Sequence, residues 1–259
     1  IDESVRGMDL YILVDVCNYS LTYSMSGNTN HMSPDDHYQN LKRIIAAVGG
    51  KAKRINVIMP FLYESRQHKR SSRESLDCAL ALQELTHMGV DNIITFDAHD
   101  PRVQNAIPLS GFETVRPTYQ FVKGLLDRYD DLIIDSDHMM AISPDEGATE
   151  RAVYLANVLN LDMGMFYKRR DYTRVVNGRN PIVAHEFLGS SVEGKDVIIL
   201  DDMISSGDSI LDVAKQLKSR NAKRIFAAAT FGLFTNGLDK FDEAYESGLI
   251  DGVLTTNLI

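Results

Sequence analysis

The residues of this chain that are best suited to chemistry lie together in residues 197–210. An apolar run there ends in two acids, Asp201 and Asp202, and a loop of small polar residues follows before a helical pattern begins. The loop consists of Ser205, Ser206, Gly207, Asp208 and Ser209. The amides of such a loop and of a helix N-terminus present N–H donors to a phosphate, and the two carboxylates can accept hydrogen bonds from sugar hydroxyls. The stretch therefore predicts a site for a phosphorylated sugar.

Short apolar runs predict the strands that position this site. They are residues 9–15, 54–59, 92–96, 131–134, 196–200, 224–229 and 252–255. The runs lack the apolar–polar alternation of a half-exposed strand, which is typical of a parallel sheet covered on both faces. Helical patterns lie between them, over residues 34–48, 75–88, 147–160 and around 210–217. This alternation predicts an α/β fold, in which ligands bind outside the carboxyl ends of the strands.

The chain also contains a weak internal sequence repeat. Residues 52–61 resemble residues 222–231, and each segment follows an amphipathic helix and enters an apolar strand. Together with the strand–helix alternation, this predicts two related α/β halves. We place the boundary after an irregular stretch, which gives domains of residues 1–116 and 117–259. The last predicted strand either stays in the second domain or returns to the first.

Length, charge and cysteine content exclude several classes of protein. A chain of 259 residues can bury a substantial core in one large or two small domains. The formal net charge is −9, which is unsuited to non-specific nucleic-acid binding, and no apolar run approaches the ~20 residues that span a bilayer. The two cysteines, Cys17 and Cys78, cannot build a disulfide framework. We expect a cytoplasmic protein that binds neither nucleic acid nor membrane, and, because the chain starts at Ile1, a piece of a longer protein.

Further motifs, in chain order, resemble the ribose-phosphate pyrophosphokinase family, also called phosphoribosyl pyrophosphate synthetases. They are residues 3–7, residues 60–67 with the basic run to Arg73, Asp-Ala-His at 97–99 followed by Pro101 and Gln104, Ser-Pro-Asp-Glu-Gly at 143–147, Tyr-Lys-Arg-Arg at 167–170, and residues 255–259. Residues 201–209 resemble the sugar-phosphate loop that this family shares with type I phosphoribosyltransferases. The resemblance covers nearly the whole chain.

The resemblance implies a fold, a reaction and its partners. The fold is two similar phosphoribosyltransferase-like α/β domains, each a mostly parallel sheet flanked by helices. The reaction moves a diphosphoryl group from ATP to the 1-hydroxyl of ribose 5-phosphate and releases AMP. The resemblance also implies Mg²⁺ as cofactor and a homo-oligomer, either a dimer or a hexamer.

The same resemblance implies roles for individual residues. ATP would be bound by Arg66, Gln67, Arg73 and His99; Mg²⁺ by His99 and Asp145; ribose 5-phosphate by Asp201, Asp202 and the loop 205–209; and Lys168 and Arg170 would be catalytic. Guanidinium groups suit this assignment because they bind phosphate oxygens in pairs. Mg²⁺ prefers oxygen ligands, which makes Asp145 the better of the two metal candidates. Residues 171–181 look like a flap over the substrate.

Four features depart from the family's pattern. Ser205 stands where the family has a third acid, Asp208 and Ser209 stand where it has Gly and Thr, and His68 stands where an Asp follows Arg-Gln. A carboxylate of Asp208 directed at the phosphate would repel it, so we expect this side chain to point outward. Residues 18–34 look like an insertion, and their polar composition predicts an exposed loop.

These departures keep two alternatives open. The first is a non-catalytic subunit that associates with a catalytic phosphoribosyl pyrophosphate synthetase and regulates it. The second is a phosphoribosyltransferase that consumes phosphoribosyl pyrophosphate. The second alternative explains the serine-rich loop, but it explains neither the basic loop at 66–73 nor the two-domain length.

Overall fold

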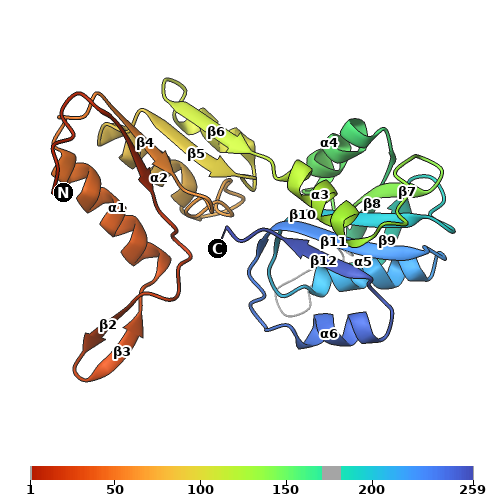
Figure 1. Cartoon of the computed structure of the whole chain (residues 1–259). Coiled ribbons are helices and arrows are strands. Elements are labelled where there is room, and N and C mark those ends of the chain that lie inside the picture. Colours follow the sequence, from red (N-terminus) through yellow and green to blue (C-terminus); the bar gives the residue numbers. More distant parts are fainter. Residues whose placement is uncertain (1, 171–181, 259) are drawn as a thin grey trace. The chain divides into compact units, whose positions relative to one another are not determined.

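The computed structural model describes residues 2–170 and 182–258, with the side chains of 168–170 and 182–185 outside the description. The chain folds into two compact units (Figure 1). The first contains Ile1–Pro117 together with Asn257–Ile259, and the second contains Thr118–Thr256. Within the described residues, no helix has the length and apolar character needed to cross a membrane.

The first unit is built on a four-stranded parallel sheet with the order β1-β4-β5-β6. Its strands are β1 (Asp9–Leu13), β4 (Arg54–Ile58), β5 (Asn92–Phe96) and β6 (Gly111–Val115). Its helices are α1 (Pro34–Val48), α2 (Asp77–His87) and the short 3-10 helix η1 (Pro101–Ala106). One buried apolar cluster joins the sheet to α1 and α2.

Helix α1 begins and ends where local signals in the sequence predict. The Ser33 hydroxyl accepts from the amide of Asp36, whose carboxylate accepts from the Ser33 amide in return, and Pro34 occupies the first turn. Gly49 ends the helix with φ 58°, a left-handed conformation that favours glycine. The predicted helix is therefore confirmed.

The prediction of an exposed loop over 18–34 is wrong in part. Strands β2 (Thr22–Met25) and β3 (Asn28–His31) form an antiparallel hairpin there. Ser26 and Gly27 make the turn with φ values of 52° and 77°, as a two-residue hairpin turn requires. Most side chains of both strands are exposed. Because neither face is buried, the apolar–polar pattern that reveals a strand is missing.

The second unit contains a six-stranded sheet with the order β12-β11-β10-β7-β8-β9, in which only β9 runs antiparallel. Its strands are β7 (Met139–Ser143), β8 (Asp162–Arg170), β9 (Ile182–Leu188), β10 (Asp196–Ile204), β11 (Arg224–Gly232) and β12 (Gly252–Thr255). Its helices are α3 (Thr118–Arg128), α4 (Thr149–Leu159), α5 (Asp208–Lys218) and α6 (Asp239–Glu246). The last strand, β12, pairs with β11.

Helices cover both faces of this sheet (Figure 1). Val197 and Ile199 of β10 pack in a cluster with α5 and α6, whereas Ile198 and Leu200 pack in a cluster with α3 and α4. Successive strand residues point to opposite faces, so both sets must be apolar. The continuous apolar runs predicted this arrangement, and the α/β fold with flanked parallel sheets is confirmed.

One predicted strand is wrong. Residues 131–134 are irregular, and Ile133 is half exposed. The sheet instead takes β7, in which all five residues are buried. Asp131, in this irregular segment, accepts a hydrogen bond from Arg224, the first residue of β11. The Met-rich sequence of β7 carries little β-branched character, so propensity favoured the wrong segment.

The internal sequence repeat, residues 52–61 and 222–231, corresponds to a structural repeat. Asp9, the first residue of β1, lies beside Arg54, the first residue of β4, and their side chains form a bidentate ion pair. Asp196, the first residue of β10, pairs in the same register and the same way with Arg224, the first residue of β11.

The repeat extends to the third strand of each set. Asp91 precedes β5 and its carboxylate accepts from the Ile55 amide at 2.8 Å, and Asp251 precedes β12 and accepts from the Ile225 amide at 2.8 Å. The prediction of two related halves is therefore confirmed.

Candidate functional site

The predicted phosphate loop lies at the carboxyl end of β10. The strand runs to Ile204, beyond its predicted end at residue 200, and α5 begins at Asp208. Between them Gly207 adopts φ 81°, and a Cβ there would collide with the ring of Phe241 from α6. The conformation and the crowding together require glycine. The tight turn places the first amides of α5, which have no partners within the helix, next to the end of the strand.

The two acids of β10 lie in a buried setting. Asp202 is 2% exposed, and Asp201 lies beside it with its carboxylate accepting from the Asp202 amide. Burial, and then the neighbouring charge of Asp202, raise the pKa of Asp201 well above its ordinary value. Two crowded carboxylates of this kind favour a shared proton, a cation or donated hydroxyl groups. The hydroxyls of a bound ribose are such donors.

Asp145 lies at the same edge of the sheet. It follows β7, which pairs in parallel with β10, so both strands end on one side. Its Oδ1 accepts from the amides of Gly147 and Ala148 at 2.9 and 3.2 Å, just before α4. Its charge contributes to the raised pKa of Asp201. The structure therefore brings three predicted residues together: Asp145, Asp201 and Asp202.

The carboxylate of Asp208 is paired rather than free. Lys240 of α6 donates to its Oδ1 at 2.6 Å, and the Ser206 hydroxyl donates to its Oδ2 at 3.0 Å. The hydrogen bond from Lys240, followed by that from Ser206, lowers the pKa of Asp208. Sequence spacing gave no sign of this partner, because 32 residues separate Asp208 from Lys240.

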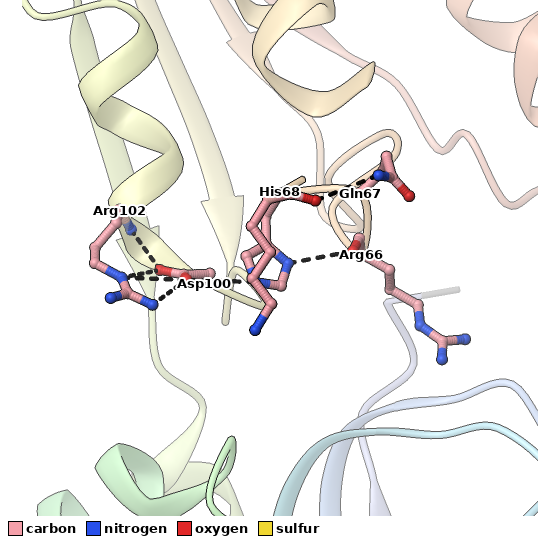
Figure 2. Close-up of polar contacts among 6 residues, drawn as sticks. Arg66, Gln67, His68, Asp100 and Arg102 are labelled. Carbon is pink, nitrogen blue, oxygen red and sulfur yellow. Dashed lines mark hydrogen bonds and ion pairs between the residues drawn. The ribbon is translucent and has the colours of Figure 1, made fainter. Parts of the chain in front are cut away.

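The basic loop follows β4 in the first unit. Gln67 is half-buried and donates to the carbonyl of Ser75 at 2.9 Å, which ties the loop to the start of α2. Arg66 and Arg73 are exposed, and Figure 2 shows the Arg66 side chain extending away from its neighbours His68 and Asp100. An exposed cationic side chain of this kind can contact a phosphate group.

Two histidines meet beside this loop. The rings of His68 and His99 contact edge to face with centroids 5.1 Å apart. Nδ1 of His68 lies 3.2 Å from the Arg66 carbonyl, to which it donates, and Nε2 lies 3.5 Å from Asp100 (Figure 2). Burial and the neighbouring His99 lower the pKa of His68. The contacts place His99 next to the predicted ATP-binding residues.

Asp100 and Arg102 complete this group, and the sequence did not single them out as functional. Arg102 donates to both carboxylate oxygens of Asp100 (Figure 2). These hydrogen bonds lower the pKa of Asp100 to about 2. Asp100 therefore stays ionised beside His68. The position of Asp100 directly after the Asp-Ala-His motif is the one available signal.

The predicted metal and catalytic residues are only partly described. His99 belongs to the first unit and Asp145 to the second. Within residues 2–170 and 182–258, no group of three or more His, Cys, Asp or Glu side chains is arranged to hold a metal ion. Lys168 and Arg170 lie in β8, with side chains outside the description, and the predicted flap 171–181 lies outside the described residues. Of the two predicted metal ligands, Asp145 provides the oxygen donors that Mg²⁺ prefers.

Two family models match the chain. The N-terminal domain of ribose phosphate pyrophosphokinase matches residues 1–89, and the phosphoribosyl transferase domain matches residues 115–248. The second match includes β7, β10 and the phosphate loop. Each model thus matches one of the two related halves.

Individual relatives match over the whole length. The ribose-phosphate pyrophosphokinase of Mycoplasma genitalium is 31% identical over 260 residues, covering 100% of this chain and 70% of the relative. The one from Chromobacterium violaceum is 30% identical, covering 99% of this chain and 70% of the relative. The crystal structure of phosphoribosylpyrophosphate synthetase from Mycobacterium smegmatis superposes with a TM-score of 0.77 at 26% identity, covering 100% of this chain and 76% of that one. With the matching motifs spread over both halves, the chain belongs to the ribose-phosphate pyrophosphokinase family.

Proposed function

We propose that this protein is a ribose-phosphate pyrophosphokinase that transfers the diphosphoryl group of ATP to ribose 5-phosphate, forming phosphoribosyl pyrophosphate and AMP. The observation that carries the proposal is the phosphate loop with its acid pair at the carboxyl end of β10. The 1-hydroxyl oxygen forms a bond to the β-phosphorus, the bond between this phosphorus and the α-phosphate oxygen breaks, and the hydroxyl proton is released. Chemistry of this kind depends mostly on positioning and charge stabilisation.

The second unit supplies groups suited to ribose 5-phosphate. The amides of Ser205 to Ser209 and the N-terminus of α5 would bind the 5-phosphate. Asp201 and Asp202 would accept hydrogen bonds from the ribose hydroxyls, which satisfies two crowded carboxylates. The depth of Asp202 and the raised pKa of Asp201 support this role, because a donor that arrives with the substrate relieves their repulsion.

The first unit supplies cationic and imidazole groups suited to ATP. Arg66 and Arg73 would bind phosphate oxygens, while Gln67 and His99 would contact the nucleotide. Mg²⁺, when bound, would neutralise phosphate charge, with His99 as the proposed ligand from the first unit and Asp145 as the proposed ligand from the second. Asp145 is suited to this because its Oδ1 is fixed by two amides, which aims the carboxyl group. We assign ATP binding to domain 1–116 and ribose 5-phosphate binding and catalysis to domain 117–259.

The assembly and compartment follow the family expectation. We propose a cytoplasmic homo-oligomer, either a dimer or a hexamer. Sedimentation velocity of the purified protein tests this, because a sole monomer species at micromolar concentration would contradict it.

A variant of Lys168 separates this enzyme from a non-catalytic regulatory subunit. Lys168 and Arg170 would meet the charge that develops on the transferred group, and interactions made only in the transition state raise turnover without tightening substrate binding. Losing one such donor typically lowers kcat by about 100- to 1000-fold. We expect Lys168→Ala to lower kcat by roughly this factor while the KM for ribose 5-phosphate changes little.

The regulatory alternative makes the opposite prediction. The replacement of a loop acid by Ser205 favours that alternative, since it removes a charge from the sugar-phosphate loop. If the wild type forms no AMP under any metal condition, and Lys168→Ala instead impairs association with a catalytic homologue, the proposal is wrong.

A further inference from the structure

Helix α6 contacts the phosphate loop through two adjacent side chains. The ring of Phe241 fills the space where Gly207 would carry a Cβ, and Lys240 pairs with Asp208. Phe241 is 6% exposed and its ring packs edge to face on Phe234, with centroids 5.4 Å apart. A buried, packed ring is fixed in position. Lys240 therefore belongs to a helix that packs directly against the phosphate loop.

Lys240 meets a negative charge at the phosphate loop. Asp208 is the first residue of α5, beside the amides that would bind the phosphate. An ionised carboxylate within about a Debye length of a phosphate, roughly 8–10 Å, repels it. Lys240 donates to this carboxylate at 2.6 Å, and the Ser206 hydroxyl donates to the same group. The loop's extra negative charge thus has a matched positive partner.

This ion pair does little for the fold. The side chains of Lys240 and Asp208 are 52% and 56% exposed, and exposed pairs contribute little to stability. We instead expect the ion pair to affect the binding of a charged group next to it. A phosphate group arriving at the loop is such a charge.

We propose that Lys240 is a positioning residue for ribose 5-phosphate: it neutralises and holds the Asp208 carboxylate so that the loop accepts the 5-phosphate. The inference rests on the proposed function of this loop. It adds a residue from α6 to a site otherwise formed by β10 and α5. Lys240 acts through Asp208, which distinguishes it from a lysine that contacts the phosphate directly.

Four variants test the inference by calorimetry with ribose 5-phosphate and by steady-state kinetics. Lys240→Ala removes the cationic partner of the Asp208 carboxylate, and we expect the dissociation constant and the KM to rise about three- to tenfold at low salt. Asp208→Asn removes the repulsion, so the double variant is expected to bind within about twofold of Asp208→Asn alone. The defect of Lys240→Ala should shrink in high salt.

Lys218→Ala is the matched control. It removes a lysine from the last residue of α5, about 15 Å along the helix from Asp208, and it should leave the affinity unchanged. The unfolding midpoint of Lys240→Ala should match that of the wild type, which excludes a general loss of folding.

Three results would overturn the inference. Unchanged affinity in Lys240→Ala would show that the ion pair does not contribute to ribose 5-phosphate binding. A double variant as weak as Lys240→Ala would show that Lys240 contacts the phosphate itself. In both cases the wild type still binds ribose 5-phosphate and the proposed function stands, whereas a wild type that binds none would overturn the inference and the proposed function together.

Discussion

Gly207→Ala should destabilise the second unit by an amount that follows from its local geometry. The residue has φ 81°, and a side chain in the left-handed region costs about 1–2 kcal/mol. The new methyl group would also overlap the ring of Phe241, which is 6% exposed and held by Phe234. Overpacking of a filled core typically costs about 1–3 kcal/mol. We expect a total loss of about 2–5 kcal/mol.

Gly194→Ala separates the two contributions. Gly194 has φ 71°, but a Cβ there would meet no atom within 4 Å. It should therefore cost only the backbone contribution, about 1–2 kcal/mol. The difference between the two variants, about 1–3 kcal/mol, is then the cost of displacing Phe241.

Urea unfolding followed by hydrogen exchange and mass spectrometry is the assay, because it reports on peptides of residues 118–256 separately. Gly207→Ala should also weaken binding of ribose 5-phosphate, whereas Gly194→Ala should not. If both variants lose the same stability and both bind ribose 5-phosphate normally, the argument that α6 supports the phosphate loop is refuted.

Three further predictions have distinct outcomes, and the first compares two variants. Arg224→Ala leaves the nearly buried Asp196 unpaired and should lower the free energy of unfolding in urea by about 3–5 kcal/mol. Arg54→Ala, which breaks the exposed counterpart of this ion pair, should lower it little. Equal losses of stability would contradict the role of burial. Burial raises the folded-state pKa of Asp201, so the stability contributed by its protonated form is lost as the pH rises. Asp201→Asn should therefore be more stable than the wild type at pH 7, and this difference in stability should shrink at acid pH. The variant should also bind ribose 5-phosphate more weakly, and lower stability than the wild type at pH 7 would refute this reasoning. Asp145→Asn keeps an acceptor for the amides that precede α4 but loses the charge, so calorimetry should show weaker Mg²⁺-ATP binding with an unchanged unfolding midpoint; unchanged affinity and activity would count against the metal assignment.

Local signals account for what the sequence predicted well. Ser33, Pro34 and Gly49 mark the ends of α1 through contacts within a few residues. The strand β10 and the acids that follow its apolar run are likewise encoded in one continuous stretch. Features of this kind need no knowledge of the rest of the fold.

Contacts between distant segments account for what was missed. The hairpin β2–β3 is held by backbone pairing with no buried face, so its side chains carry no pattern. The partners of Asp208 and His68 are Lys240 and Asp100, each 32 residues away in the chain. The resemblance to the family marked Asp208 as a departure, and only the fold shows that Lys240 balances its charge.

The central claim is a specific bond cleavage in ATP, and phosphorus NMR of the purified protein with ATP, Mg²⁺ and ribose 5-phosphate tests it most directly. The account predicts AMP and a sugar-linked diphosphate in equal amounts, dependent on ribose 5-phosphate and formed about 100- to 1000-fold more slowly by Lys168→Ala. Formation of ADP, or no AMP under any metal condition, would contradict it.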